Sequence, residues 1–517
     1  MTRAALAAAL ALGGSLAGCT ETLVLGAFPG GGEGGGSGGT NEVFAPQTVT
    51  RWAPFLEWSI TSTTWTGDPY TLPASVTFVH DSGAEHTTPM FYAGDDVWRV
   101  RFCGTELGGW TWRSSSEDPD LDDRTGTIEV IPNPDPDTTG FVTSVASELG
   151  THWARPRGNA DDVELLAPQL VMMPPPAGYR DDPTGYLARV DAFLEQGFAG
   201  IYVHTVGNDW LADTGEPNPA TFEALEAIIV HVHGAGGWVH VWGWDTSQRP
   251  EGGVGEASHA RLLRTLAARL GPLPGWTLGY GQAQNWLSQS ELLGAVALTN
   301  EALGWPHLQG GRAEGPQSGP DHSAVSGWNN GLGYAAYAHF APDYDVYVAA
   351  MADSPQQPVL SADRFRVRDP VVDGDPTFDE IPLRLWQSAI AGGVANIWAN
   401  FLGGGSAEAG SDPFPPEVAD AVTTYARFWR DRLRPGLRRT TVDGAPALRS
   451  LAADRWVVLA VDRDALVLDL SPAPGAVTAF AIDIALPYAE VPLGTLDPGQ
   501  HDLSLPYAAD WAIALEP

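Results

Sequence analysis

The stretch from residue 169 to residue 398 alternates short apolar runs with longer segments in which apolar residues recur at helical spacing. Short apolar runs bounded by turn residues are typical of strands buried on both faces of a parallel sheet. We interpret eight runs as strands: 169–173, 200–205, 238–242, 276–279, 307–310, 345–349, 358–361 and 394–398. The helical segments between them include 184–196, 221–233, 258–270 and 381–391.

Eight strand–helix units predict a TIM barrel, because a parallel array of this kind closes on itself. In such barrels the functional site lies on the loops that follow the carboxyl ends of the strands. An open doubly wound sheet is the alternative, but no glycine-rich phosphate-binding sequence supports it. We therefore expect the chemistry of this chain at the ends of the eight strands.

Two regions with the period-two alternation of antiparallel strands flank the predicted barrel. Residues 47–132 contain SVTFVH and VWRVRF, in which every second residue faces the same side, with turn signals between them. Four further short alternating runs follow the barrel: 456–461, 465–470, 479–484 and 510–515. The chain is therefore predicted to be multidomain, with an N-terminal β-sandwich at 47–132, the barrel at 133–433 and a small C-terminal β-sandwich at 434–517.

The N-terminus has the composition of an export signal. Arg3 precedes an Ala/Leu-rich run that ends in Leu16-Ala17-Gly18-Cys19, as in a secretory signal peptide. This ending resembles a bacterial lipoprotein box, which implies a signal at residues 1–19 with cleavage before Cys19, lipidation of that Cys and attachment to the membrane. Because residue 20 is Thr and not Asp, the resemblance also implies an outer-membrane location in the cell envelope. Residues 20–46 then form a Gly-rich flexible tether.

Charge and cysteine content narrow the class of partner. The formal net charge is −35 and all 28 basic residues are Arg, so a nucleic-acid partner is disfavoured for want of a basic stripe. Cys103 is the only other cysteine, and because a lipidated Cys19 cannot pair with it we expect a buried thiol and no disulfide. His231, His233 and His240 lack a zinc-binding spacing, and we expect neither a metal nor a cofactor.

Two blocks of the sequence resemble one family of bacterial polysaccharide enzymes. The first contains VTFVHDSG, MFYAGDDVWRVRF and GGWTWRSSS and resembles the immunoglobulin-like domain that precedes agarase-like and apiosidase-like barrels. The second runs from GWTLGYG through HLQGGRAEGP and PVLSADRFRVR to AGGVANIW and resembles the barrel itself, which looks like a clan-A glycoside hydrolase. The resemblance implies two catalytic glutamates, an acid/base after the fourth strand and a nucleophile after the seventh.

This sequence departs from that pattern at both catalytic positions. The acid/base position falls in the segment 282–285, where the polar residues are amides, which cannot donate a proton near neutral pH. The nucleophile position falls on Ser361-Ala362-Asp363, and by the resemblance Ala362 stands where the nucleophile is expected. An alignment shifted by one residue would make Asp363 the nucleophile, with Asp245 or Glu314 as the acid.

The side chains that follow the predicted strands favour a glycan ligand. Indole rings stack on sugar faces, and amide, carboxylate and guanidinium groups bind hydroxyls. The predicted sugar-binding residues are Asp209, Trp210, Trp242, Trp244, Gln282, Gln284, Asn285, Trp286, Arg312, Arg364, Trp398 and Asn400. The favoured hypothesis is a surface-anchored, glycoside-hydrolase-like protein that binds a polysaccharide or oligosaccharide without cleaving it. The alternatives are an active O-glycosyl hydrolase that uses Asp363 with Asp245 or Glu314, and a structural or adhesive surface protein.

Overall fold

The computed structural model describes most of the chain that follows the predicted tether. The described residues are 43–160, 162–205, 210–212, 215–243, 257–281, 287–312, 331–337, 339, 342–367, 375–400 and 414–517. Within these ranges the side chains of Asp363, Arg364 and Asn400 are not described. All described residues belong to one compact unit, Asn41–Pro517. The predicted signal peptide, Cys19 and most of the tether lie outside the described residues.

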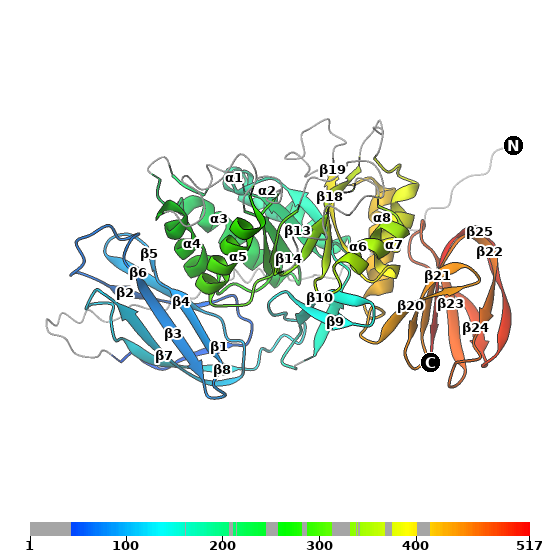
Figure 1. Ribbon diagram of the computed structural model, residues 1–517, viewed down its shortest axis with the longest axis horizontal. Helices are drawn as coiled ribbons and strands as arrows, with labels where there is room; N and C mark the ends of the chain where they lie inside the picture. Colours follow the sequence, from blue (N-terminus) through cyan, green and yellow to red (C-terminus); the bar gives the residue numbers. More distant parts are fainter. Residues whose placement is uncertain are drawn as a thin grey trace, which may run out of the picture. The chain divides into compact units, whose positions relative to one another are not determined.

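The N-terminal β-domain (blue in Figure 1) contains eight strands in two sheets. The strands are β1 Gln47–Thr50, β2 Leu56–Thr61, β3 Ala74–His80, β4 Glu85–Pro89, β5 Phe91–Tyr92, β6 Val97–Phe102, β7 Gly108–Ser116 and β8 Thr125–Ile131. The larger sheet has the order β1-β8-β7-β3-β4 and the smaller one β2-β6-β5. Phe78 of β3 meets Trp58 of β2 with 6.0 Å between the ring centroids, so the two sheets share one core, as period-two alternation predicts. Cys103, directly after β6, is a buried free thiol.

The central domain is a nearly closed parallel barrel of eight strands (Figure 1). Its strands are β12 Gln169–Met173, β13 Gly200–His204, β14 Trp238–Trp242, β15 Trp276–Gly279, β16 Gln309–Gly310, β17 Ala335–Tyr337, β18 Val359–Val367 and β19 Ala395–Asn400. Neighbouring strands follow the order β16-β15-β14-β13-β12-β19-β18-β17. Between β16 and β17 the Gly333 N–H donates to the carbonyl oxygen of Gln309 at 2.7 Å. The predicted TIM-barrel architecture is therefore confirmed.

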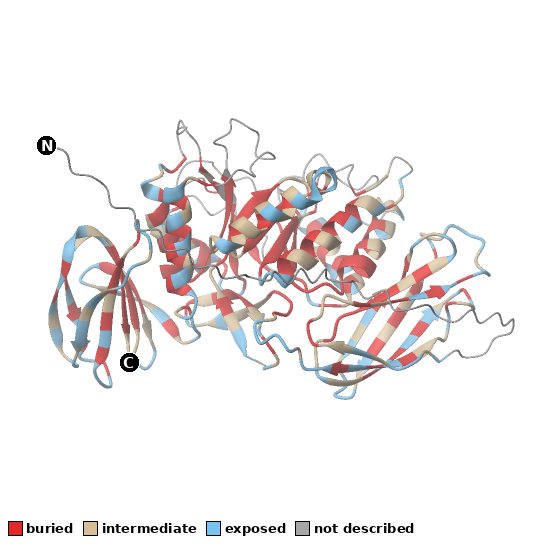
Figure 2. Cartoon of the chain, turned by 180° about the vertical axis from the view of Figure 1, so that it is seen from behind, coloured by how far each residue is buried: buried red, intermediate tan, exposed pale blue. Residues whose placement is uncertain are grey.

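Helices surround the barrel and bury their apolar sides against it, as the red positions in Figure 2 show. They are α1 Pro176–Asp181, α2 Pro183–Glu195, α3 Pro219–Gly234, α4 Ala257–Leu270, α5 Gln289–Leu303, α6 Tyr344–Asp353, α7 Glu380–Ile390 and α8 Pro416–Trp429. Several start at residues that favour a helix N-terminus: α2, α3 and α8 begin with Pro, and α5 has a capping box between Ser288 and Glu291. No helix of the described ranges is long and apolar enough to cross a membrane.

One predicted strand was wrong. The segment 345–349 lies inside helix α6, and the sixth barrel strand is β17, which was not predicted. The Asp343 side chain accepts a hydrogen bond from the Val346 N–H and so caps the helix. The buried residues Val346, Tyr347, Ala350 and Met351 recur at helical spacing. The β-branched run DVYV suggested a strand only because the cap was overlooked.

A three-stranded sheet closes the amino-terminal end of the barrel. It comprises β9 Thr143–Ser147, β10 Gly150–Pro156 and β11 Val163–Leu166. The Trp153 indole, fully buried, donates from Nε1 to the carbonyl oxygen of Val359, the first residue of β18, at 2.8 Å. Its ring lies 5.3 Å from that of Trp238, the first residue of β14. Because Trp153 fills this end, an open hollow inside the barrel can face only the carboxyl ends of the strands.

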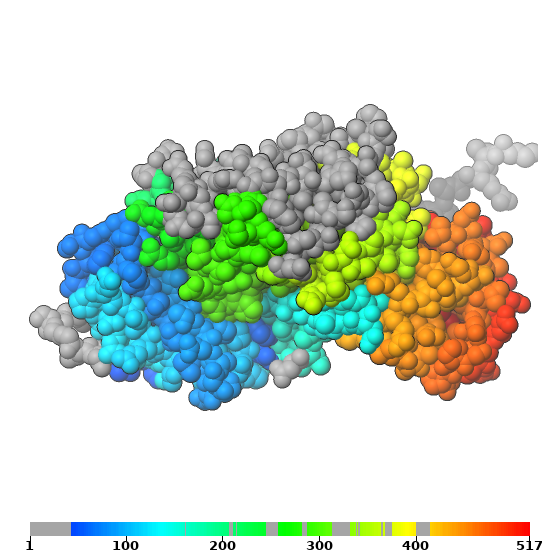
Figure 3. Space-filling view, viewed as in Figure 1, coloured from blue at the N-terminus to red at the C-terminus, as the bar shows by residue number. Residues whose placement is uncertain are grey.

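The C-terminal domain (orange to red in Figure 3) is one six-stranded sheet, β20-β21-β22-β25-β23-β24. Its strands are β20 Leu437–Val442, β21 Ala445–Ser450, β22 Trp456–Asp469, β23 Val477–Asp483, β24 Val491–Leu496 and β25 Gln500–Glu516. The predicted strands 456–461 and 465–470 are two halves of β22, which is interrupted by register shifts at Arg463. Residues from both halves of β22 belong to one hydrophobic core. The region predicted as a sandwich is a single sheet whose long strands contain irregularities.

A buried charge network joins the N-terminal β-domain to the helices of the barrel. Arg101 of β6 donates from Nε to Glu57 of β2 at 2.7 Å, and its Nη1 lies 2.9 Å from Glu226 Oε1 in α3. Arg269 of α4 pairs with the same Glu226, and Arg101 also donates to the carbonyl oxygen of Arg269 at 2.7 Å. Each buried cation in this network therefore has an anionic partner. We call these four residues the boundary network.

Candidate functional site

A small hollow opens inside the barrel near the carboxyl ends of its strands, and we call it the barrel hollow. Its wall is formed by Tyr202, His240, Trp242, Gly279, Gly281, Gly311, Arg312, Tyr334, Ala336, Leu360, Ala362 and Ile397. These residues belong to strands β13 to β19 or lie within two residues of them. This is the end of the barrel at which TIM-barrel proteins bind ligands.

One part of the wall of the barrel hollow is formed by the phenols of Tyr202 and Tyr334 and the imidazole of His240. His240 of β14 stacks on Tyr202 of β13 with 5.5 Å between ring centroids, and its Nδ1 lies 2.8 Å from the hydroxyl of Thr277. The Tyr334 hydroxyl donates to the carbonyl oxygen of Gly310 at 3.1 Å. Burial lowers the pKa of His240 to about 3 and raises the pKa of Tyr334 well above 10. His240 and Tyr334 are therefore uncharged at neutral pH, and His240 is no proton donor there.

Two glycines make this close packing possible. A Cβ on Gly279, the last residue of β15, would lie 2.7 Å from His240 Nε2, and one on Gly310 would lie 2.6 Å from the ring of Tyr334. Neither position can carry a side chain without displacing a ring of the hollow. The glycines that end strands β15 and β16 thus have a packing role at the site.

Another part of the wall of the barrel hollow is formed by the indole of Trp242 and the guanidinium group of Arg312. Trp242, the last residue of β14, is partly exposed, and its ring meets Tyr202 edge-on with centroids 5.4 Å apart. The Cζ atom of Arg312 lies 5.5 Å from the centroid of the Trp242 ring. The Arg312 backbone N–H donates to the carbonyl oxygen of Gly281 at 2.9 Å, which fixes the residue beside the end of β15.

The guanidinium of Arg312 is buried, and none of the described residues places a carboxylate within ion-pair distance of it. The residue is 6 % exposed, and its Nε has no hydrogen-bond partner. No Asp or Glu of the described ranges lines the hollow. The described wall of the site is therefore aromatic and cationic.

Ala362 is one of two residues that strand β18 contributes to the wall of the hollow, and the other is Leu360. The backbone register of β18 against β19 shifts between Ser361 and Arg364, which spans this position. A methyl group here supplies neither a nucleophile nor a proton. The position that the family resemblance assigns to the nucleophile thus lies at the site and carries no catalytic group.

The remaining predicted site residues lie largely outside the described residues. Backbone and side chain are both undescribed for Asp209, Trp244, Asp245, Gln282, Gln284, Asn285, Trp286 and Glu314. For Asp363, Arg364 and Asn400 only the backbone, in β18 and β19, is described. Of the predicted residues whose side chains are described, Trp242 and Arg312 come together at the hollow.

Trp210 and Trp398 correct the sugar-binding prediction, because neither has an exposed face. Trp398 is 0 % exposed, and its Nε1 donates to Gln169 Oε1 at 2.9 Å. Strand residues alternate sides, so Trp398 points away from the hollow that its neighbour Ile397 lines. Trp210 is 1 % exposed and donates from Nε1 to the carbonyl oxygen of Gly243 at 2.5 Å. Both indoles are packing residues.

Sequence reasoning missed Tyr202, His240 and Tyr334 as site residues. A usable signal was present, because His240 precedes Trp242 by two residues on one strand and must face the same side. The histidines considered for zinc have partners of their own. His231 Nε2 lies 2.6 Å from Asp191, and His233 forms a hydrogen bond with the carbonyl oxygen of Thr139. No group of three or more His, Cys, Asp or Glu side chains in the described part could hold a metal ion.

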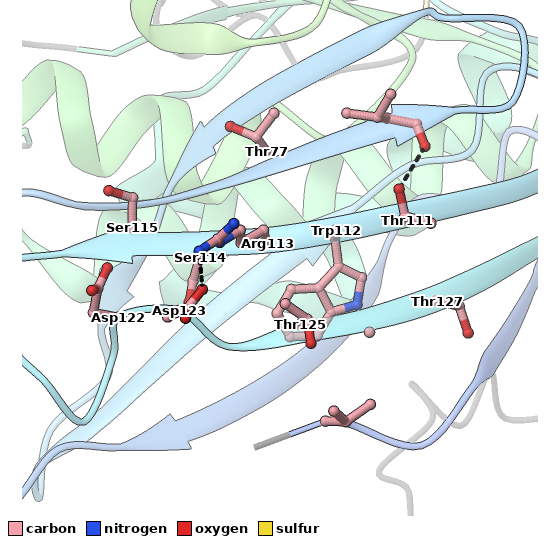
Figure 4. Close-up of a pocket in the computed structure, with 13 residues that line it drawn as sticks. Thr77, Thr111, Trp112, Arg113, Ser114, Ser115, Asp122, Asp123, Thr125 and Thr127 are labelled. Carbon is pink, nitrogen blue, oxygen red and sulfur yellow. Dashed lines mark hydrogen bonds and ion pairs between the residues drawn. The ribbon is translucent and has the colours of Figure 1, made fainter. Parts of the chain in front are cut away.

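A wider hollow lies on the N-terminal β-domain (Figure 4). It is lined mainly by hydroxyl groups, such as those of Thr77 and Thr111, and by Arg113, which pairs with Asp123 at 2.5 Å. Trp112, its aromatic lining residue, is buried and offers no ring face. Because its one cation is already paired and no ring is exposed, we place the candidate site in the barrel hollow.

Comparisons with known proteins agree with this architecture. Residues 48–117 match a family described as a domain of unknown function, DUF5060. A comparison with curated proteins found no match. The fold is similar to a candidate glycoside hydrolase from Bacteroides vulgatus ATCC 8482, with a TM-score of 0.72, 15 % identity, and coverage of 91 % of this chain and 99 % of that one. It is also similar to a family 5 glycoside hydrolase from the same organism, with a TM-score of 0.54, 13 % identity, and coverage of 72 % and 93 %.

At these identities the likeness establishes fold and not activity. The chain has a nearly closed eight-stranded parallel barrel with separate β-domains before and after it. Its overall fold is that of a multidomain, glycoside-hydrolase-like TIM barrel.

Proposed function

We propose that this protein binds a glycan at the mouth of the barrel hollow and does not cleave it. The observation that carries the proposal is the composition of the hollow, in which aromatic rings and Arg312 surround Ala362. A partly exposed indole such as Trp242 provides a flat apolar face for a sugar ring. Phenol, imidazole and guanidinium groups around it provide hydrogen bonds to hydroxyls. The glycoside-hydrolase names of the structural neighbours support a carbohydrate as the ligand class.

The absence of cleavage follows from what hydrolysis requires. A retaining glycosidase needs a proton donor and a carboxylate nucleophile about 5 Å apart. Ala362 occupies the position that the resemblance assigns to the nucleophile, and the neutral His240 cannot replace the acid. Hydrolysis by Asp363 with Asp245 or Glu314 is the competing reaction, and the variant Asp363→Asn distinguishes it.

We further propose that the protein is held at the cell envelope, in the outer membrane, by a lipid on Cys19. The N-terminal β-domain is proposed to be of the immunoglobulin-like type that precedes such barrels. The Leu16-Ala17-Gly18-Cys19 sequence supports the anchor. Metabolic labelling with a radioactive fatty acid should label the wild type and not Cys19→Ala; equal labelling of both would contradict the anchor.

The experiment that tests glycan binding is a glycan-array screen of the full chain, followed by titration of the best ligand. Trp242→Ala should weaken binding by about 1–3 kcal/mol, because the platform for the sugar ring is lost. Tyr507→Ala is the matched control, since it removes an aromatic ring that is 47 % exposed on the C-terminal domain. No binding on a broad array would contradict the proposal. Equal loss in both variants would contradict the assignment to the hollow.

A further inference from the structure

Arg312 stands out because none of the described residues around it carries the opposite charge. A guanidinium group is protonated at every physiological pH, so it cannot avoid the cost of burial by losing its charge. The residue is 6 % exposed, its Nε has no partner, and its guanidinium contacts the Trp242 ring. A charge buried in this way is unfavourable unless an anion joins it.

The geometry of the hollow points to the kind of anion. The guanidinium is planar and presents paired N–H donors that match the two oxygens of a carboxylate. Arg312 and Trp242 line the same hollow, so a sugar ring on the indole would hold a ring substituent near the guanidinium. The other polar groups described in the wall, from Tyr202, His240 and Tyr334, are uncharged and suit the hydroxyls of the same sugar.

We infer that the glycan bound at the mouth of the barrel hollow is acidic, and that Arg312 binds the carboxylate of a hexuronate residue. This inference rests on the proposed function and names its ligand class. Ala362 contributes to the binding of an acidic glycan. Its short side chain leaves this position in the wall of the hollow without a protein carboxylate that could pair with Arg312. Arg312 is thus the residue that determines specificity for an acidic over a neutral sugar.

The net charge of −35 opposes an acidic ligand at long range. At physiological ionic strength this repulsion is screened beyond about 8 Å, whereas a buried pair is screened much less. Recognition therefore has to be local, at one buried cation. Binding of short acidic oligomers should accordingly strengthen when salt is raised from low to physiological concentration, the reverse of the behaviour of a basic surface.

The test compares acidic oligosaccharides with their neutral methyl esters. Oligomers of galacturonate, glucuronate and mannuronate, each as the free acid and as the methyl ester, are titrated into the full chain by calorimetry at about 0.15 M salt. The wild type should bind at least one free acid roughly ten- to a hundredfold more tightly than its ester, as expected for a buried charge-assisted pair.

Arg312→Gln should remove this preference by weakening the acid to the level of the ester while leaving the ester unchanged. Arg463→Gln is the matched control, because it removes the same charge from an exposed pair on the C-terminal domain. Thermal unfolding of each variant checks that the fold is intact.

Three results would overturn the inference. They are equal affinity for acid and ester, a preference that survives Arg312→Gln, and Arg312-dependent binding of sulfated but not uronate oligomers. In each of them the protein still binds a glycan, so the proposed function stands. Failure to bind any sugar on a broad array, acidic or neutral, contradicts the proposed function itself.

Discussion

The boundary network and the barrel hollow bury the same kind of side chain in opposite ways. Arg101, whose side chain is 4 % exposed, has Glu57 and Glu226 within 3 Å, and Arg269 shares Glu226. Arg312, which is 6 % exposed, lies against the Trp242 ring, and its Nε is unsatisfied. Burial alone therefore does not tell what a buried arginine is for.

The difference lies in where the compensating charge comes from. At the boundary it comes from the protein itself: burial acts to raise the pKa of the Glu226 carboxyl, but Arg101 and Arg269 outweigh burial and bring its pKa below the ordinary value. For Arg101, burial acts to lower the pKa, and the attraction of Glu226 and Glu57 reverses the shift. At the hollow no described residue supplies the compensating charge, and we propose that a ligand supplies it. The first cation is structural and the second is available for recognition.

The largest expected effect is that of acid on the barrel, which holds buried neutral histidines. Burial lowers the pKa of His152, His233 and His307 to about 4 and that of His240 to about 3. An unfolded chain takes up protons at these residues below its ordinary pKa of about 6.5, whereas the folded chain does not. Their contribution to stability is thus complete above pH 6.5 and is lost as the pH falls towards 4.

The loss should amount to about 1.4 kcal/mol per histidine for each pH unit within that window. Four such residues can remove the 5–15 kcal/mol stability of an ordinary domain within about two pH units. Calorimetric unfolding between pH 8 and pH 4 measures this effect. A melting temperature that stays constant from pH 7.5 to pH 4.5 would show that these histidines are not buried in neutral form.

The next largest effect is expected from Glu226→Gln. The substitution keeps the size of the side chain but leaves Arg269 without its carboxylate and Arg101 with one instead of two. We expect a loss of about 3–5 kcal/mol in the free energy of unfolding, measured by denaturant titration. Asp137→Asn is the control, since it breaks an exposed pair with Arg157 and should cost no more than about 1 kcal/mol.

The pH dependence of that loss sharpens the assignment. The folded pKa of Glu226 is depressed, so its contribution is present above the ordinary pKa of 4.5 and disappears only as the pH falls further. The difference between wild type and Glu226→Gln should therefore be constant from pH 8 to pH 5. A difference that shrinks near pH 6 would contradict an ionised, paired Glu226.

The smallest effect, and one of opposite sign, is expected from Arg312→Met without ligand. Replacing an uncompensated buried cation with an apolar side chain of similar length should leave stability unchanged or raise it by about 1–2 kcal/mol. The same change at Arg101 should destabilise the protein by about 3 kcal/mol or more, because it removes a buried cationic partner from both Glu57 and Glu226. If both variants lose stability equally, Arg312 is a structural residue and the comparison fails.

The sequence was sufficient for seven of the eight barrel strands and insufficient for the interior of the site. Largely apolar strands such as β12 and β14 were placed correctly at both ends, because short apolar runs are typical of strands buried in a parallel sheet. Trp153 gave no signal, since a single Trp in a polar segment does not reveal that it closes the barrel. The adjacent residues Ile397 and Trp398 could not both face the hollow, and alternation would have excluded Trp398.

The role of Arg312 shows what a sequence cannot supply. An arginine at a strand end predicts a polar contact, and Trp242 and Arg312, both predicted at the rim, both line the hollow. Whether its charge is matched depends on which side chains the fold brings within 4 Å, and those come from distant parts of the chain. The roles of Arg101 and Arg312 cannot be distinguished from the sequence alone. They differ in the side chains that lie around them in the folded protein.

Binding without cleavage is tested by mass spectrometry of the best array glycan after prolonged incubation with the full chain, under conditions in which calorimetry shows the glycan bound. We expect the glycan to be recovered intact, because Ala362 offers no nucleophile. New reducing ends that appear with the wild type and disappear with Asp363→Asn would contradict it and identify a hydrolase whose nucleophile follows Ala362 by one residue.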